Sequence, residues 1–256
     1  MSGFSLEGRV AVVTGGTSGI GLALVRGLAE AGADVVATSR RPKQVDAAAA
    51  EVEQRGRRTV RVTSDVGDRA TLQAALEQTV AELGKVDILV NCAGITKRTP
   101  TLDVTDEEWN SIMATNVTGT LRACQVFGRH MLERGYGRII NIASLSSFVG
   151  LFEVAAYTTS KSAVAGLTRA LAVEWGSRGV NVNAIAPGVF RTALNAGLLD
   201  GTERGKEFRI RTPLGRFGRL EELAGACVFL ASEGASFVNG EILAVDGGFL
   251  ASGVNQ

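Results

Sequence analysis

The chain has 256 residues, 45% of them hydrophobic, so it can bury a sizeable core and is too apolar to be disordered. Its 27 Lys and Arg against 26 Asp and Glu give a net charge of +1, which offers no global field for nucleic acid or an acidic membrane. Three scattered cysteines and one histidine argue against a disulfide framework and against a metal site. Neither a signal-peptide pattern nor a run of about 18 apolar residues occurs, which predicts a cytoplasmic protein.

Seven short apolar runs predict the strands of a parallel sheet. Each run is continuous rather than alternating, which is typical of strands that are buried on both faces. They lie at residues 9–13, 35–38, 59–62, 86–90, 138–142, 180–185 and 241–245. Amphipathic stretches between them predict helices at residues 19–31, 69–83, 157–175 and 221–231. Thr105 is expected to cap a further long helix that extends to residue 134, because acidic residues follow it directly.

This alternation predicts one domain, residues 1–256, with a doubly wound α/β Rossmann fold. We expect a mostly parallel seven-stranded sheet with helices on both faces. A polar and irregular stretch at residues 192–212 breaks the rhythm. It predicts a mobile flap over a pocket, at about residues 190–215.

A glycine-rich turn ends the first predicted strand and opens the next helix. Glycine permits positive φ and close approach of the backbone to a ligand, and a helix N-terminus presents free N–H groups to a phosphate. The position of the turn in the first βα unit therefore predicts a dinucleotide site, although a plain tight turn is the alternative. The residues of this site are Thr14, Gly15, Thr17, Ser18, Gly19, Ile20 and Gly21.

The second predicted strand leads into Ser39, Arg40 and Arg41, about 20 residues beyond the turn. A site that prefers NAD(H) usually places an acidic residue there to bind the ribose hydroxyls. The small serine leaves room instead, and two guanidinium groups suit a 2′-phosphate. We therefore expect a preference for NADP(H), with NAD(H) as the second choice. The alternative is that the arginines simply open the next helix in solvent.

Six motifs then occur in an order that carries a resemblance. They are the glycine turn at residues 14–21, Asn91-Cys92-Ala93-Gly94, Asn116, Ser144, Tyr157-x-x-x-Lys161 and Pro187-Gly188. Over almost its whole length the chain resembles the short-chain dehydrogenase/reductase family. Cys92 is a small departure, because many members of the family have Asn there.

The resemblance implies an oxidoreductase that moves a hydride between a nicotinamide and a carbinol or carbonyl carbon, without a metal. It implies Tyr157 as the general acid/base and Lys161 as the residue that tunes Tyr157 and binds ribose. Ser144 would hold and polarise the substrate oxygen, and Asn116 would anchor a proton-relay water. Each of these residues also has an ordinary structural interpretation when it is taken singly.

The pairing of Tyr157 with Lys161 has a physical basis. The two residues are four positions apart on a predicted helix, so they share a face. A free tyrosine has a pKa near 10, and a nearby ammonium group and an oxidised nicotinamide both favour the phenolate. Lowering that pKa by about three units needs roughly 4 kcal/mol, which a close cation in a partly dry cleft supplies.

The resemblance also extends the cofactor site to residues that follow the later strands. Asp65 and Val66 would meet the adenine. The further residues, on the ribose, nicotinamide and carboxamide side, are Asn91, Ala93, Gly94, Pro187, Gly188, Val189 and Thr192.

The substrate is indicated by one stretch only. Residues 94–100 resemble the branch of the family that contains gluconate 5-dehydrogenases and deoxygluconate dehydrogenases. Lys97 and Arg98 would lie at the cleft edge, where a cation suits a sugar-acid carboxylate, although a solvated loop or a subunit contact is the alternative. Candidates for the pocket wall are Ser146, Glu153 and Phe190. The glutamate would repel an acid if it pointed inward.

These observations favour an enzyme that interconverts a secondary alcohol and a ketone with NADP(H), on a gluconate-like sugar acid or a polyol. The alternatives are a 3-oxoacyl-carrier-protein reductase and, in another class, a non-catalytic cofactor-sensing protein. The expected partners are the small-molecule substrate and further copies of the chain, in a homotetramer or homodimer. No nucleic acid and no membrane partner is expected.

Overall fold

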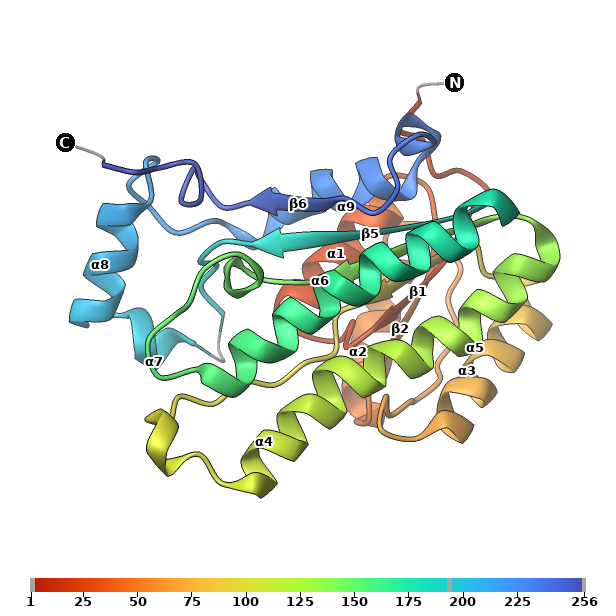
Figure 1. Ribbon diagram of the computed structural model, residues 1–256. Helices are drawn as coiled ribbons and strands as arrows, with labels where there is room; N and C mark the ends of the chain where they lie inside the picture. The colour runs from red at the N-terminus through yellow and green to blue at the C-terminus, as the bar shows by residue number, and fades with distance from the viewer. Residues whose placement is uncertain (1–2, 193–194, 255–256) are drawn as a thin grey trace.

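The computed structural model describes residues 3–192 and 195–254 of the chain. At its centre lies one sheet of six strands, in the order β2-β1-β3-β4-β5-β6 (Figure 1). The strands are β1 Val10–Thr14, β2 Asp34–Thr38, β3 Ile88–Asn91, β4 Gly137–Ile142, β5 Val180–Pro187 and β6 Ile242–Val245. The direction of the strand order reverses between β1 and β3, and ligands of such sheets bind at the carboxyl ends beside this point.

Within the described residues the sheet has six strands, one fewer than the seven predicted, and all of them are parallel. The predicted strand at residues 59–62 is an extended segment beside β2. Backbone hydrogen bonds hold it on both sides of this run, from Val35 N to Arg58 O and from Ser64 N to Ser39 O, each at 3.1 Å. Its two valines are buried, so packing explains the apolar run although the segment forms no ladder.

Helices cover both faces of the sheet, as predicted (Figure 1). One face carries α1 Gly19–Glu30, α2 Pro42–Glu53 and α9 Ala224–Ala231, and the other carries α3 Arg69–Leu83, α5 Gly119–Arg134 and α6 Ala155–Trp175. Val12 and Val13 of β1 point into opposite cores, because successive strand residues face opposite sides. Within the part of the chain that the structure describes, no helix is long and apolar enough to cross a membrane.

The predicted helix that Thr105 caps is interrupted. The Thr105 hydroxyl accepts a hydrogen bond from Glu108 N at 3.2 Å and so opens α4 Asp106–Met113, as expected. A π-helical turn, Ala114–Thr118, then separates α4 from α5. Such turns insert a residue into the helix and often occur at functional sites, and this one carries Asn116.

The predicted irregular flap at residues 192–212 is largely helical. It forms α7 Ala196–Leu199 and α8 Glu203–Arg211, while residues 193 and 194 lie outside the described residues. The Thr202 hydroxyl caps α8 by accepting from Gly205 N at 3.0 Å. The segment buries little apolar surface, so its sequence lacks the apolar periodicity by which the longer helices are predicted. Both helices lie beside the loop that leads into α6 (Figure 1).

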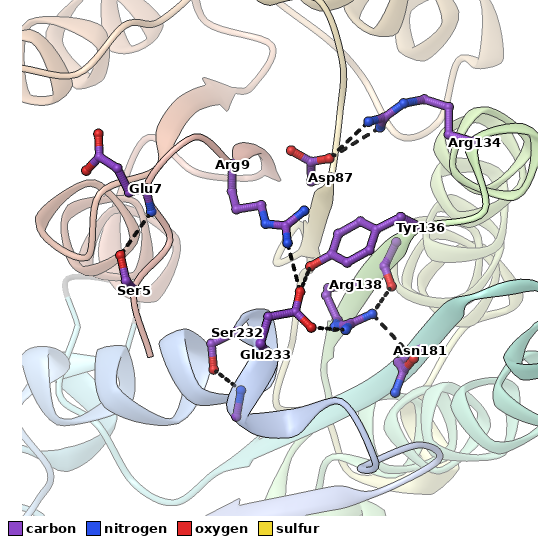
Figure 2. Close-up of polar contacts among 12 residues, drawn as sticks. Ser5, Glu7, Arg9, Asp87, Arg134, Tyr136, Arg138, Asn181, Ser232 and Glu233 are labelled. Carbon is purple, nitrogen blue, oxygen red and sulfur yellow. Dashed lines mark hydrogen bonds and ion pairs between the residues drawn. The ribbon is translucent and has the colours of Figure 1, made fainter. Parts of the chain in front are cut away.

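Two arginines and a tyrosine gather at the amino edge of the sheet, where the strands begin (Figure 2). The ring of Tyr136 lies 4.1 Å from the guanidinium carbon of Arg9 and 4.6 Å from that of Arg138. Glu233 accepts hydrogen bonds from Arg9 and from the Tyr136 hydroxyl, each at 2.8 Å. These contacts join the starts of β1 and β4 to the turn after α9, at the end of the sheet opposite the carboxyl edge.

Candidate active site

The carboxyl ends of four strands open into one cavity of about 850 Å³. Thr14, Cys92, Ala143 and Pro187 stand at or just beyond the ends of β1, β3, β4 and β5 and line it. This volume is in the range of sites that bind cofactors and substrates. The cavity therefore lies where a doubly wound sheet is expected to hold its ligand.

Most of the predicted site residues line this cavity. They are Thr14, Gly15, Thr17, Ser18, Gly19, Ile20, Gly21, Ser39, Arg40, Arg41, Asp65, Val66, Ala93, Gly94, Ser144, Tyr157, Lys161, Pro187, Gly188, Phe190 and Thr192. Parallel strands bring these residues together although they range from residue 14 to residue 192.

Several predicted residues do not line the cavity, and several lining residues were not predicted. The predicted residues outside the lining are Asn91, Asn116, Val189, Arg98, Ser146 and Glu153. The additional lining residues are Ser64, Cys92, Ile95, Thr96, Ser111, Thr115, Ile142, Ala143 and Asn195. Cys92 belongs to the motif at residues 91–94, and Ile95 and Thr96 follow it directly, so the motif was a usable signal for all three. Ser111, Thr115 and Asn195 reach the cavity only through packing.

The glycine turn lacks room for side chains. A Cβ atom on Gly15, where φ is +67°, would stand 2.8 Å from the backbone nitrogen of Ala93. A Cβ atom on Gly21 would stand 2.2 Å from the carbonyl oxygen of Gly15. The N-cap residue of α1, Ser18, makes no side-chain cap hydrogen bond, so the first N–H groups of the helix face the cavity without a side-chain cap. This arrangement fits a phosphate of a dinucleotide.

Arg40 and Arg41 provide two exposed positive charges at one end of the cavity. Among the described residues, neither guanidinium is paired with an acidic side chain. Ser39 lies beside them, and its Oγ accepts a hydrogen bond from Arg41 N at 3.4 Å. Two unpaired guanidinium groups next to a small hydroxyl fit the 2′-phosphate of NADP(H).

The two predicted asparagines support the cavity from behind. Asn116 Oδ1 accepts from Ile95 N at 2.8 Å, and its Nδ2 donates to Ile95 O at 2.9 Å and to Ser160 Oγ at 3.0 Å. Asn116 thus fixes the loop after β3 with both ends of its amide. Asn91 Nδ2 donates to Asn141 Oδ1 at 2.9 Å, which ties the ends of β3 and β4 together.

Ser144, Tyr157 and Lys161 meet on the floor of the cavity. Lys161 Nζ donates to Ile142 O at 2.7 Å and lies 5.7 Å from the centroid of the Tyr157 ring. Ser144 Oγ accepts from Ser146 N at 3.2 Å, and the Ser144 side chain is also hydrogen-bonded to Tyr157. Tyr157 and Lys161 both project from α6, as their spacing predicts.

Burial controls the proton affinities of this cluster. It raises the pKa of Tyr157, against the opposing effect of the Ser144 hydroxyl. It also lowers the pKa of Lys161 to about 8. Among the protein's own groups the predicted lowering of the pKa of Tyr157 is therefore not present. That prediction included the positive charge of an oxidised nicotinamide.

The pKa of Lys161 predicts how ketone reduction depends on pH. Its ammonium form, which exists below the pKa of about 8, is the form that stabilises a phenolate at Tyr157. We expect kcat/KM for reduction to fall about tenfold per pH unit above that value, because the free enzyme loses this proton. Stopped-flow or steady-state rates between pH 6 and 10 check this. A decline in kcat/KM that begins only near pH 10 would contradict this prediction. In Lys161→Met we expect low activity that shows no such decline with pH.

The basic residues expected at the cleft edge are already paired. Lys97 Nζ lies 2.6 Å from Glu108 Oε2, and Arg98 Nε lies 2.7 Å from Glu153 Oε2. Ser146 is buried behind the cavity, with 1% of its surface exposed. Of the predicted pocket-wall residues, Phe190 alone lines the cavity.

A doubly wound parallel sheet with a glycine turn at its first strand and a Tyr–Ser–Lys cluster at its carboxyl edge defines a class. That class is the NAD(P)-dependent oxidoreductases that act on a CH–OH group. A family model described as enoyl-(acyl carrier protein) reductase matches residues 15–250. The chain belongs to the short-chain dehydrogenase/reductase family.

Known relatives match the chain along nearly its full length. A 2-dehydro-3-deoxy-D-gluconate 5-dehydrogenase of Dickeya dadantii is 44% identical, over 97% of this chain and 98% of its own. A gluconate 5-dehydrogenase of Burkholderia cenocepacia, solved with NADP and tartrate, is 40% identical with a TM-score of 0.94, over 98% of both chains. A putative NAD(P)-dependent gluconate 5-dehydrogenase of Beutenbergia cavernae, with bound NADP, is 46% identical with a TM-score of 0.93, over 98% of this chain and 100% of its own.

Proposed function

We propose that the protein interconverts a secondary alcohol and a ketone on a sugar acid of the gluconate/5-ketogluconate type, with NADP(H). The cluster of Ser144, Tyr157 and Lys161 on the cavity floor carries the reaction class. The sugar-acid substrate is supported by the relatives, three of which are named for gluconate or deoxygluconate chemistry.

The position of each residue around the cavity supports a proposal for the part of NADP(H) that it would hold. The glycine turn and the start of α1 would hold the pyrophosphate, Arg40 and Arg41 the 2′-phosphate, and Asp65 with Val66 the adenine. Lys161 would also bind ribose. The residues of the nicotinamide side would be Ala93, Gly94, Pro187, Gly188 and Thr192, which line the cavity. Asn91 and Val189 were predicted with them, and each is next in sequence to a lining residue but does not line the cavity itself. When bound, this cofactor supplies or accepts the hydride.

The protein's own residues handle the proton. In reduction, the carbonyl oxygen takes a proton from Tyr157 Oη while it accepts a hydrogen bond from Ser144 Oγ. The ammonium group of Lys161 stabilises the phenolate that remains. In oxidation the same phenolate takes the proton of the alcohol. Asn116 would anchor a water that returns protons to this pair.

One alternative substrate class, the acyl thioesters, is also supported by the comparison with known families. The family model that matches the chain is described as enoyl-(acyl carrier protein) reductase, which names an enzyme of acyl thioesters. A 3-oxoacyl thioester, which carries a ketone for the Tyr157 cluster to protonate, is therefore the second candidate. Acetoacetyl-CoA serves as its probe. The non-catalytic alternative is set aside, because the chain belongs to an enzyme family and retains Tyr157 and Lys161.

The first experiment measures NADPH oxidation by the purified protein with 5-keto-D-gluconate, beside NADH and beside acetoacetyl-CoA. We expect turnover with NADPH and the keto acid. Turnover with the thioester alone would overturn the sugar-acid proposal and support the second candidate. Binding of NADPH without turnover of either compound would overturn both substrates.

Arg40 and Arg41 give a separate prediction on cofactor preference. We expect Arg40→Ala/Arg41→Ala to lower the ratio of kcat/KM with NADPH to that with NADH by about tenfold to a hundredfold, because two charge-assisted hydrogen bonds are lost. Activity with NADH should persist. Lys43→Ala is the matched control, since Lys43 is exposed nearby on α2 but does not line the cavity. An unchanged ratio would refute the assignment.

Three broader expectations stay proposals. The chain would act as one domain whose α7–α8 segment covers the substrate, in the cytoplasm. It would self-associate as a homotetramer or homodimer. Val173 on α6 is 87% exposed and Leu102 is 100% exposed, which leaves apolar surface for such a contact. Size-exclusion chromatography with light scattering tests the oligomeric state.

A further inference from the structure

Lys97 and Arg98 in the loop after β3, and Arg204 on α8, lie on segments that contact the stretch before Tyr157, although none of the three lines the cavity itself. The first two are ion-paired, with Glu108 and Glu153 respectively. Arg204, near the start of α8, has no acidic side chain within ion-pair distance among the described residues. Of these three, Arg204 is therefore the one that is not ion-paired.

Arg204 is held in place by neutral groups. Its Nη1 donates to the carbonyl oxygen of Phe152 at 3.1 Å, and its guanidinium carbon lies 5.4 Å from the ring centroid of Phe208. Glu207, one turn along α8, pairs with Arg211 at 3.0 Å. Partial burial, and after it the charge of Arg98, lower the pKa of Arg204, while Glu153 and Glu207 oppose this shift.

The position of Arg204 relates it to the reacting groups. Its partner, the Phe152 carbonyl, is five residues before Tyr157 in the same segment. Thr99 N donates to Glu153 O at 2.8 Å, so the loop that carries Arg98 is joined to that segment. Thr96 of this loop lines the cavity, and Arg98 follows it by two residues, a backbone span of at most about 7 Å. Figure 1 shows α8 beside the loop that enters α6.

We propose that Arg204 is a specificity-determining residue that binds the carboxylate of an acidic substrate. This inference rests on the proposed function. Arg98, Glu153 and Arg204 together carry one net positive charge, which a monoanionic substrate neutralises. Guanidinium groups bind carboxylates with paired, charge-assisted hydrogen bonds, whereas the hydroxyl groups of a neutral polyol accept only weaker, uncharged hydrogen bonds, much as water does. The carboxylate of 5-keto-D-gluconate lies four carbon–carbon bonds from its ketone, so the two ends reach different groups.

The test compares two ketones that differ at one terminal carbon. L-Sorbose carries a hydroxymethyl group where 5-keto-D-gluconate carries its carboxylate. In Arg204→Gln we expect KM for the keto acid to rise and the ratio of kcat/KM, acid over ketose, to fall by about tenfold to a hundredfold. The kcat for L-sorbose should stay within about twofold. Arg204→Lys should retain more of the preference for the acid than Arg204→Gln does, because lysine keeps the positive charge but lacks the paired N–H donors of a guanidinium group.

Arg209→Gln is the matched control, since Arg209 is an exposed arginine of the same helix that lies over Phe217. It should leave the ratio unchanged. If the wild-type protein shows no preference for the acid, the proposed sugar-acid function fails and this inference with it. If the wild type prefers the acid and Arg204→Gln keeps that preference, this inference alone is overturned. NADPH binding to each variant, followed by fluorescence, confirms that it is folded.

Discussion

Tyr157→Phe should lower kcat for ketone reduction by about 10²-fold to 10⁴-fold, the usual contribution of a positioned general acid. The substitution removes only the phenolic oxygen, and the ring that lies 5.7 Å from Lys161 Nζ is retained. NADPH should still bind, because the glycine turn and the arginines at residues 40 and 41 are untouched. Absorbance assays of turnover measure the loss of kcat, and fluorescence titration measures whether NADPH affinity is retained.

The chain offers a matched control for this substitution, since it contains two tyrosines. Tyr136 lies at the opposite edge of the sheet, with its hydroxyl on Glu233 (Figure 2). Tyr136→Phe removes the same atom and should leave kcat within about twofold. A Tyr157→Phe protein that retains more than a tenth of the wild-type kcat would exclude Tyr157 as the proton donor.

Gly21→Ala should destabilise the fold and weaken NADPH binding together. The new Cβ atom would stand 2.2 Å from the carbonyl oxygen of Gly15, so the turn must move. Overpacking of this kind costs about 1–3 kcal/mol, and a shifted turn should raise the Kd for NADPH by about tenfold or more. Denaturant unfolding and fluorescence titration check the two effects.

Gly225→Ala is the control for the general effect of filling a glycine. Gly225 is an exposed glycine of α9, and nothing lies within 4 Å of its added Cβ atom. Alanine should stabilise that helix by about 0.5–1 kcal/mol and leave the Kd unchanged. Wild-type NADPH affinity in Gly21→Ala would mean that the phosphates do not bind at this turn.

Local patterns determined much of what could be predicted. The apolar runs at β1, β2, β4 and β5 and the periodicity of α3 follow from burial and from side-chain direction within one element. The Thr105 cap and the glycine turn likewise depend on neighbouring residues only. The position of the glycine turn and of residues 39–41 in the first βα units also predicted that they lie in the cavity, whereas most other cavity residues were predicted from the family resemblance.

Other features depended on contacts that no local pattern contains. The run at residues 59–62 is apolar because its side chains are buried. It is not a strand of the sheet, because only the residues that flank it hydrogen-bond to β2 and its neighbour. The break between α4 and α5 coincides with Asn116, whose amide binds Ile95 across 21 residues of sequence. The short helices α7 and α8 bury too little to show the period of a packed helix.

The basic residues near the cavity show most clearly what the sequence alone could not determine. Lys97 and Arg98 are adjacent in a basic stretch, so the sequence by itself favours them as the cations that meet an acidic substrate. The fold pairs Arg98 with Glu153, 55 residues away, and places Arg204 against a carbonyl 52 residues away. The sequence thus determined that basic groups lie near the site. Only the tertiary structure decided which one is unpaired, because electrostatic energy depends on distances in space and on burial.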